Sequence, residues 1–332
     1  MGGVISFDMI DFLGTDRFSA IGDAPVIVVD AARWLPPAPG VQAVVIGIDH
    51  SGELPTANPA HFDLLLTPVA GAPAPWVSAG RLDEQVERLA SAVRDWPVAA
   101  TMLCQVLRLS EGLSFSAGFE IESLAYSTLL GGAEFAQWKS ARAGQEVPYS
   151  GTPLVLVERD VDVITLTLNH PLAHNAMTAA MRDALYAALA NVLDDPSGPS
   201  VVLQGAGRCF STGGALGEFG TATDLAEAHL IRTVRNVAGL LYRLGNRASV
   251  RLHGACVGSG LEVPAAAAHR RAKQNAWFQL PELRMGLIPG AGGTASVARA
   301  IGRHRACWMV LSGKRIDAKL ALKWGLIHEI VE

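Results

Sequence analysis

The sequence predicts an α/β protein made of two units of domain size, an N-terminal module over 1–148 and a C-terminal core over 149–332. The chain is 332 residues long, and a domain typically holds about 150. Half of the residues are hydrophobic and 17% are charged, which supplies enough apolar material for buried cores. Strand-like and helix-like segments alternate along the C-terminal core, a rhythm typical of a layered α/β domain.

The N-terminal module begins with strand-like runs and continues with helices. The runs are short, β-branched or leucine-rich, and bounded by turn residues: Pro25–Val29, Ala43–Ile48 and Phe62–Leu66. Helices are then predicted over Leu82–Val93, Val98–Leu109 and Phe119–Arg142. Pro97 separates the first two helices, and Gly131-Gly132 break the third. The polar segment Arg142–Gly151 is interpreted as the linker between the units.

The C-terminal core repeats a strand–loop–helix order. Its predicted strands are Leu154–Val157, Val163–Leu168, Ser200–Leu203, Val250–Leu252 and Trp277–Phe278. A turn at Arg159-Asp160 joins the first two strands. A helix is predicted over Thr178–Leu193, with the Thr178 hydroxyl as its N-cap.

Charge and cysteine spacing argue against several classes of function. The net charge of −4 gives no electrostatic reason to expect nucleic acid or an anionic membrane surface as a partner. No apolar run has the length of a membrane span, and the N-terminus carries acids where a signal peptide carries bases. The four cysteines lie far apart, so we expect reduced, buried thiols, no bound metal and a cytoplasmic protein.

Two glycine-rich turns follow predicted strands, at Gly205–Gly214 and His253–Glu262. Glycine lets a backbone approach a ligand and present its N–H groups, and a helix start adds positive dipole potential. Two such turns that face one point could form an oxyanion hole. A nucleotide-phosphate loop is the alternative, but Gly258-Ser259-Gly260 lacks the third glycine of the dinucleotide fingerprint.

Two acids lie in apolar sequence next to such turns. Glu262 is in the first turn of the helix that Gly258 to Gly260 open, and Glu282 follows Pro281. An acid in apolar surroundings has a raised pKa, and a pair of such acids can divide into general acid and general base. The alternative for Glu262 alone is a helix-start role, in which its charge complements the dipole.

Five ordered segments carry a joint signature: Leu168–Met177, Val201–Gly214, His253–Glu262, Trp277–Thr294 and Leu311–Ile327. They resemble the patterns LNRPxxxNAM/L, VVLTGAGxxFxAGADL, NGxxxGGGxEL, FxxPExxxGxxPGxGGT and LTGxxixAxeAxxxGLV of the crotonase (enoyl-CoA hydratase/isomerase) family. The resemblance implies a crotonase-like (ββα)n spiral core that acts on a coenzyme A thioester. Coenzyme A is then part of the substrate, and no separate cofactor is expected.

The resemblance also implies roles for single residues. Gly214 and Ser259 correspond to the two oxyanion-hole N–H donors, with serine where the family usually has glycine. Glu262 and Glu282 correspond to the two hydratase glutamates: the first positions and deprotonates water, and the second handles the α-proton. The expected contacts of the CoA portion are His174, Ala176, Gly213 and Gly258. The implied reaction is hydration of a 2-enoyl-CoA thioester.

Some positions depart from the family pattern. Ala215 and His269 stand where the family usually has Asp, and His174 stands where a basic residue often meets the CoA phosphates. Isomerase, decarboxylase and thioester hydrolase reactions on the same fold are alternatives, and so is a non-catalytic CoA-binding or assembly subunit. Retention of both glutamates favours hydration. The resemblance further implies fatty acid metabolism and a homo-oligomer, either a trimer or a hexamer.

The helices predicted in the N-terminal module are similar to the tail that follows the last matched segment in this family. That tail consists of an Ala-rich helix, a P-x-A break, a second helix and a closing helix, and it covers the pocket. We therefore expect 1–148 to be a degenerate crotonase-like module whose helices pack on the core and replace the tail. An unrelated binding domain is the alternative.

Overall fold

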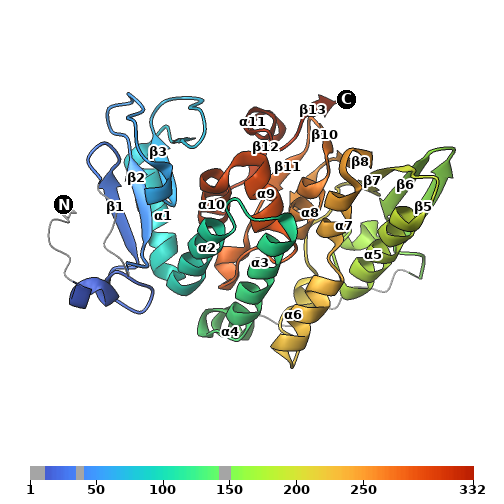
Figure 1. Cartoon of the computed structure of the whole chain (residues 1–332), viewed down its shortest axis with the longest axis horizontal. Helices are drawn as coiled ribbons and strands as arrows, with labels where there is room; N and C mark the ends of the chain where they lie inside the picture. The colour runs from blue at the N-terminus through green and yellow to red at the C-terminus, as the bar shows by residue number, and fades with distance from the viewer. Residues whose placement is uncertain (1–11, 35–40, 142–150) are drawn as a thin grey trace.

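The structure is a computed structural model and describes residues 12–34, 41–141 and 151–332. Figure 1 shows an elongated molecule with the N-terminal sheet at one end and the strands that begin the C-terminal core at the other. Of the predicted linker Arg142–Gly151, all but Gly151 lies outside the described residues. No helix in these three ranges is long and apolar enough to cross a membrane.

The N-terminal sheet is parallel, with strand order β1-β2-β3-β4. Its strands are β1 Val26–Asp30, β2 Val44–Ile48, β3 Leu64–Thr67 and β4 Val77–Ser78. The first three confirm the predicted runs, and β4 is too short to show a period. Every residue of β2 and β3 is buried, as expected of a parallel sheet covered on both faces. One face joins the main core, and the other packs on Phe18, Phe62 and Trp76.

Four helices follow: α1 Leu82–Asp95, α2 Pro97–Leu109, α3 Phe115–Leu130 and α4 Ala133–Ser140. The breaks at Pro97 and at Gly131-Gly132 are confirmed. The third helix starts earlier than predicted, because the Ser114 side chain accepts a hydrogen bond from the Ala117 N–H and caps it.

The C-terminal core has a six-stranded sheet in the order β13-β10-β8-β7-β6-β5, parallel except for the β5–β6 pair. Its strands are β5 Val155–Asp160, β6 Val163–Leu168, β7 Ser200–Gly205, β8 Ala248–Leu252, β10 His269–Lys273 and β13 Glu329–Val331. A smaller sheet has the order β12-β11-β9, with β9 Ala255–Val257, β11 Trp277–Gln279 and β12 Ile316–Asp317.

The helices of the core are α5 Ala179–Asp194, α6 Leu225–Val234, α7 Val237–Leu244, α8 Ser259–Glu262, α9 Gly293–Ile301, α10 Arg303–Ser312 and α11 Ala318–Trp324. Thr178 caps α5 as predicted, because its hydroxyl accepts from the Met181 N–H. The turn predicted at Arg159-Asp160 is wrong. Both residues pair with β6, and the chain turns after them at Val161, which has a φ of 50°.

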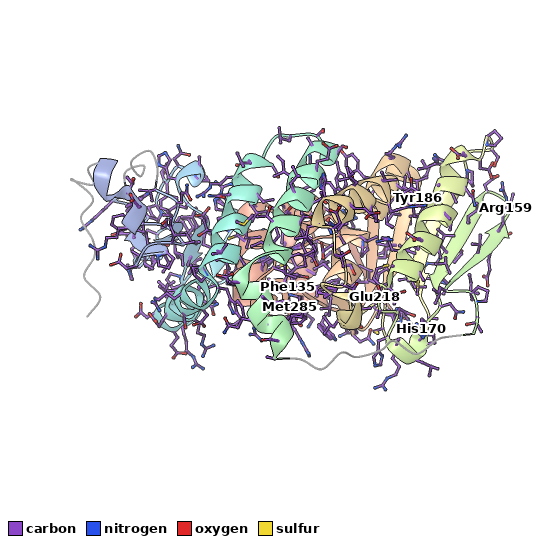
Figure 2. All side chains as sticks on the ribbon, turned by 90° about the horizontal axis from the view of Figure 1, so that it is seen from below. Phe135, Arg159, His170, Tyr186, Glu218 and Met285 are labelled. Atoms are coloured by element: carbon purple, nitrogen blue, oxygen red, sulfur yellow. The ribbon has the colours of Figure 1, made fainter. Side chains whose placement is uncertain are left out.

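The N-terminal helices pack directly on the C-terminal core, as predicted. Helix α3 contacts α6 and α9, while α1 and α2 contact α10, so one hydrophobic core runs through both units. Figure 2 shows Phe135 of α4 beside Met285 of the core. The origin of the module as a degenerate crotonase copy stays a prediction.

Candidate active site

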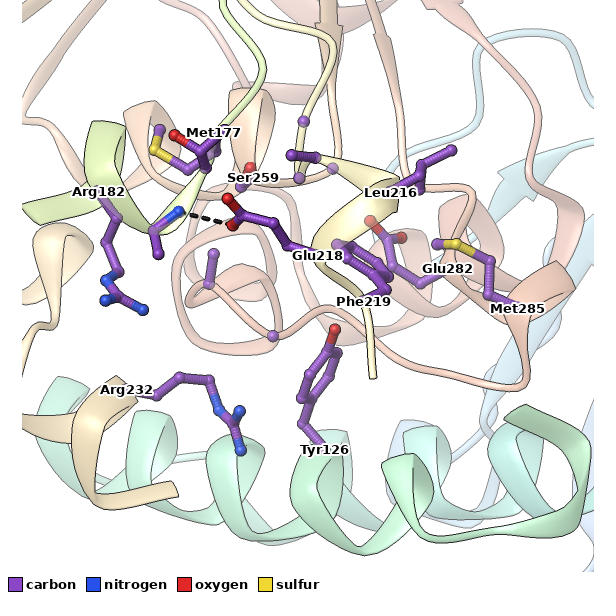
Figure 3. A pocket seen from close by; sticks show the side chains of 18 of the residues that line it. Tyr126, Met177, Arg182, Leu216, Glu218, Phe219, Arg232, Ser259, Glu282 and Met285 are labelled. Carbon is purple, nitrogen blue, oxygen red and sulfur yellow. Dashed lines mark hydrogen bonds between the residues drawn. The ribbon is translucent and has the colours of Figure 1, made fainter. Parts of the chain in front are cut away.

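A cavity of about 420 Å³ lies between α3 and the glycine-rich turns of the C-terminal core (Figure 3). It brings together the six predicted site residues Gly213, Gly214, Gly258, Ser259, Glu262 and Glu282. Tyr126 and Leu130 of α3 complete the wall from the N-terminal module. His174 and Ala176 are not among the lining residues. The carbonyl of His174 accepts from the Thr212 N–H at 3.1 Å, which helps to place the first turn.

The first turn leaves a main-chain amide unpaired. Gly213 has a φ of 90°, and its carbonyl accepts from the Met177 N–H at 2.8 Å. The Ala215 N–H donates back to the Met177 carbonyl at 3.1 Å. Gly214, between them, pairs with Met177 as an isolated parallel bridge, so its own N–H points away from that segment. It donates to no atom within the described ranges.

The second turn leaves another amide unpaired at the start of α8. Gly258 has a φ of 51°, and its N–H donates to the Gln279 carbonyl at 3.0 Å. Ser259 is the first residue of the helix, where an N–H has no partner inside the helix. No described residue accepts from this N–H, and the Ser259 hydroxyl is also buried without a partner.

The two turns lie against each other. A Cβ placed on Gly213 would come within 2.6 Å of the Val257 carbonyl oxygen and 3.5 Å of the Gly258 Cα. A Cβ on Gly258 would come within 2.9 Å of the Glu282 Oε1. Glycine at both positions therefore allows the backbones to touch and an acid to lie beside them. The unpaired amides of Gly214 and Ser259 belong to the wall that this contact builds.

The environments of the two predicted acids differ. The Oε2 of Glu262 accepts from the Ala291 N–H at 2.7 Å and the Gly293 N–H at 3.0 Å. Burial raises the pKa of Glu262 to about 7, and these amides oppose the rise. The Oε2 of Glu282 is buried and has no hydrogen-bond partner among the described residues. Burial, followed by the charge of Glu262, raises the pKa of Glu282 well above its usual range. Glu262 is therefore partly ionised at neutral pH, and burial favours the protonated form of Glu282.

A third buried acid comes from the N-terminal module. Glu122 of α3 is fully buried, and its Oε1 accepts from the Gly292 N–H at 2.6 Å. Its Oε2 accepts from the Thr294 N–H and hydroxyl, both at 2.6 Å. The amides of residues 291–294 therefore alternate between Glu262 and Glu122. Burial and the charge of Glu262 raise the pKa of Glu122 to about 8.

Sequence reasoning missed the contribution of α3. Glu122 is one of two acids that follow Phe119 in α3, and no local signal in the sequence distinguishes it from the exposed Glu120. Tyr126 lies one turn further along α3, and Figure 3 shows its hydroxyl pointing into the cavity. Within the described ranges, no group of His, Cys, Asp and Glu side chains could hold a metal ion.

Comparisons with known proteins agree on the C-terminal core. A family model described as enoyl-CoA hydratase/isomerase matches residues 158–332. The 2,3-dehydroadipyl-CoA hydratase of Escherichia coli (strain K12) is 35% identical over 176 residues, which cover 53% of this chain and 68% of that protein. The probable enoyl-CoA hydratase echA8 of Mycobacterium tuberculosis is 31% identical over 179 residues, with the same two coverages of 53% and 68%.

A solved structure is similar over the same share of the chain. It is an enoyl-CoA hydratase/carnithine racemase from Magnetospirillum magneticum, with a TM-score of 0.50 and 26% identity, covering 55% of this chain and 69% of that one. The C-terminal region therefore has a crotonase-like α/β fold. The matched family region leaves the N-terminal half, up to residue 157, unassigned.

Proposed function

We propose, because this chain belongs to the enoyl-CoA hydratase/isomerase (crotonase) family through residues 158–332, that it adds water to the double bond of a 2-enoyl-CoA thioester. Family membership implies an acyl-CoA ligand. One observation carries the proposal of hydration: two unpaired amides, of Gly214 and Ser259, share a cavity with Glu262 and Glu282. Amides of this kind stabilise an oxyanion, and the two acids hold their protons differently.

The proposed reaction begins with the thioester carbonyl oxygen accepting hydrogen bonds from the Gly214 and Ser259 amides. This polarises the double bond and stabilises the negative charge that develops on the oxygen in the enolate. The ionised form of Glu262 takes a proton from a water molecule, whose oxygen bonds to Cβ. The protonated Glu282 gives its proton to Cα, and the carbon–carbon double bond becomes a single bond. Proton exchange with water then restores both acids.

Glu122 has a positioning role in this proposal. It binds the Gly292 and Thr294 amides, so it holds the loop whose Ala291 and Gly293 amides bind Glu262. The N-terminal module would thus orient the proposed base without touching the substrate. His174 and Ala176 remain proposed contacts of the CoA portion outside the cavity. We also propose that the N-terminal module substitutes for the family's tail and that the protein forms a homo-oligomer.

The proposal is tested by following the loss of enoyl absorbance with a panel of 2-enoyl-CoA thioesters. We expect turnover by the wild type and a loss of about 10²–10⁴-fold in kcat for Glu262→Gln and for Glu282→Gln, because each variant removes one proton-transfer group. Undiminished turnover by both variants would rule out the acid–base assignment. Binding without turnover by the wild type would favour the non-catalytic alternative.

A further inference from the structure

The cavity is lined by a cation that forms no ion pair within the described ranges and that has no role in the proposed hydration. Arg232 of α6 is half-buried. Its Nε donates to the Ser123 hydroxyl at 3.1 Å, and its Nη2 donates to the Ser123 carbonyl at 3.3 Å and to the Ser127 hydroxyl. All of these acceptors are neutral. The guanidinium forms no ion pair within the described ranges, and its Nη1 has no partner there.

An aromatic ring lies beside this guanidinium, and apolar side chains line the same cavity. Its Cζ lies 4.9 Å from the centroid of the Tyr126 ring, and Leu130, Ala228 and Ile231 line the same cavity. Burial lowers the pKa of Arg232, the charges of Tyr126 and Glu122 oppose that shift, and the arginine remains ionised at neutral pH. A half-buried charge among apolar groups and neutral acceptors is unfavourable until a counter-ion arrives.

Among the described residues, no acid that lines the cavity forms an ion pair with Arg232. Figure 3 shows Arg182 on the same side as Arg232, with Glu282 on the opposite side. The Nε and Nη2 of Arg182 donate to Asp183 at 3.0 and 2.9 Å. The Oε2 of Glu218 accepts from the Ala179 N–H at 2.7 Å, at the start of α5. This side of the cavity therefore holds two cations.

We infer that the acyl group of the substrate ends in a carboxylate that Arg232 binds, so that the protein acts on dicarboxylic 2-enoyl-CoA thioesters. The inference rests on the proposed function. The thioester lies at the Gly214 and Ser259 amides, the carbon chain follows the apolar wall, and the far carboxylate accepts from the free Nη1 of Arg232. A guanidinium binds a carboxylate through charge-assisted hydrogen bonds.

The phosphates of CoA are the competing anionic ligand for Arg232, and the proposed contacts of the CoA portion lie elsewhere. His174 and Ala176 are outside the cavity, whereas Arg232 contacts α3 inside it. If Arg232 bound the phosphates, the group at the end of the acyl chain would not affect binding. The two alternatives therefore predict different affinities for acyl chains with and without a terminal carboxylate.

The first test compares thioesters of equal chain length that end in a carboxylate or in a methyl group. We expect the wild-type kcat/KM to be roughly 100-fold higher for the carboxylate series. Arg232→Met should abolish most of this ratio, and Arg232→Lys should keep part of it, because lysine retains the charge without the planar fork. Arg235→Met is the matched control. Arg235 lies on the surface next to α6 over the Tyr186 ring, outside the cavity, so its replacement should leave the ratio intact.

The second test measures binding of the saturated acyl-CoA analogues by calorimetry, so it does not depend on hydration. Tighter binding of the carboxylate-ended analogue, lost in Arg232→Met, supports the inference even if no thioester is hydrated. Equal binding of the two analogues by the wild type overturns it while the proposed function stands. Equal weakening of both analogues and of free CoA in Arg232→Met also overturns it, because Arg232 would then serve the CoA phosphates. If Arg232→Met does not fold, the wild-type ratio decides.

Discussion

The two halves of the molecule contribute to one cavity in different ways. The C-terminal half supplies two backbone turns and two acids from segments that carry a family signature. The N-terminal half supplies Tyr126 and Leu130 to the wall from one helix, and Glu122 of the same helix binds the loop that holds Glu262. The turns depend on glycines at fixed spacing, which leave a sequence pattern, whereas a helix that packs on a core needs only apolar positions and a few polar contacts. A segment without a recognisable sequence signature, such as α3, can therefore still contribute residues directly to the site.

Deleting residues 1–148 is expected to have the largest effect, and it tests whether the C-terminal half needs the N-terminal half. The apolar core is continuous from the N-terminal sheet through α1, α2 and α3 to α9 and α10. Removal of the module would expose these faces and the amides that Glu122 binds, so we expect an insoluble or unfolded remainder without activity. Expression of 149–332 beside the full chain checks this, and a soluble, active remainder would show that the module does not complete the core.

The second largest effect is expected from replacing Glu122, the side chain of α3 that binds a loop of the C-terminal half. Glu122→Ala leaves the Gly292 and Thr294 donors without acceptors in a buried loop. We expect the free energy of unfolding to fall by about 3–5 kcal/mol. The matched control is Glu120→Ala on the exposed face of the same helix, which should change it by less than about 0.5 kcal/mol. Urea titrations measure both, and equal effects would contradict the role of Glu122.

The buried acids Glu262 and Glu122 are expected to make the free energy of unfolding depend on pH. The folded pKa values of Glu262 and Glu122 are raised from 4.5 to about 7 and about 8. The contribution of such acids to stability is fully present at pH values below their pKa in the unfolded chain. It is lost as the pH rises through their pKa in the folded protein. We expect the free energy of unfolding to fall between pH 4.5 and about 8.

Glu122→Gln should remove the upper part of this fall, because glutamine does not titrate. Unfolding titrations at several pH values measure the effect. A fall that is identical in the variant and the wild type would show that Glu122 titrates alike in the folded and unfolded chain.

The smallest effect is expected at Ser259. Its proposed function uses the main-chain N–H, and its buried hydroxyl has no partner in the part of the chain that the structure describes. Ser259→Ala keeps the N–H, so kcat/KM should change by less than about threefold, and stability should rise by up to about 1 kcal/mol. Steady-state kinetics and thermal unfolding check both, and a large loss of kcat would assign chemistry to the hydroxyl.

Local patterns predicted most of the strands and the helix breaks, and the family resemblance gave six of the residues that line the cavity. They missed β10, because Ala272 is its only fully buried residue and the strand has no apolar run. They also missed Glu122, whose partner Gly292 is 170 positions away in the sequence. A contact of that separation arises only when α3 packs on the core. The unmatched cation Arg232 was missed for the same reason.

The position of new hydrogen atoms in the product tests the central claim most directly. The wild type is mixed with a 2-enoyl-CoA thioester in D₂O, and the product is analysed by mass spectrometry and NMR. We expect a 3-hydroxyacyl-CoA with one deuterium on Cα, since Glu282 delivers a solvent-derived proton there and water adds at Cβ. A shifted double bond, free CoA or unchanged substrate would contradict hydration at this site.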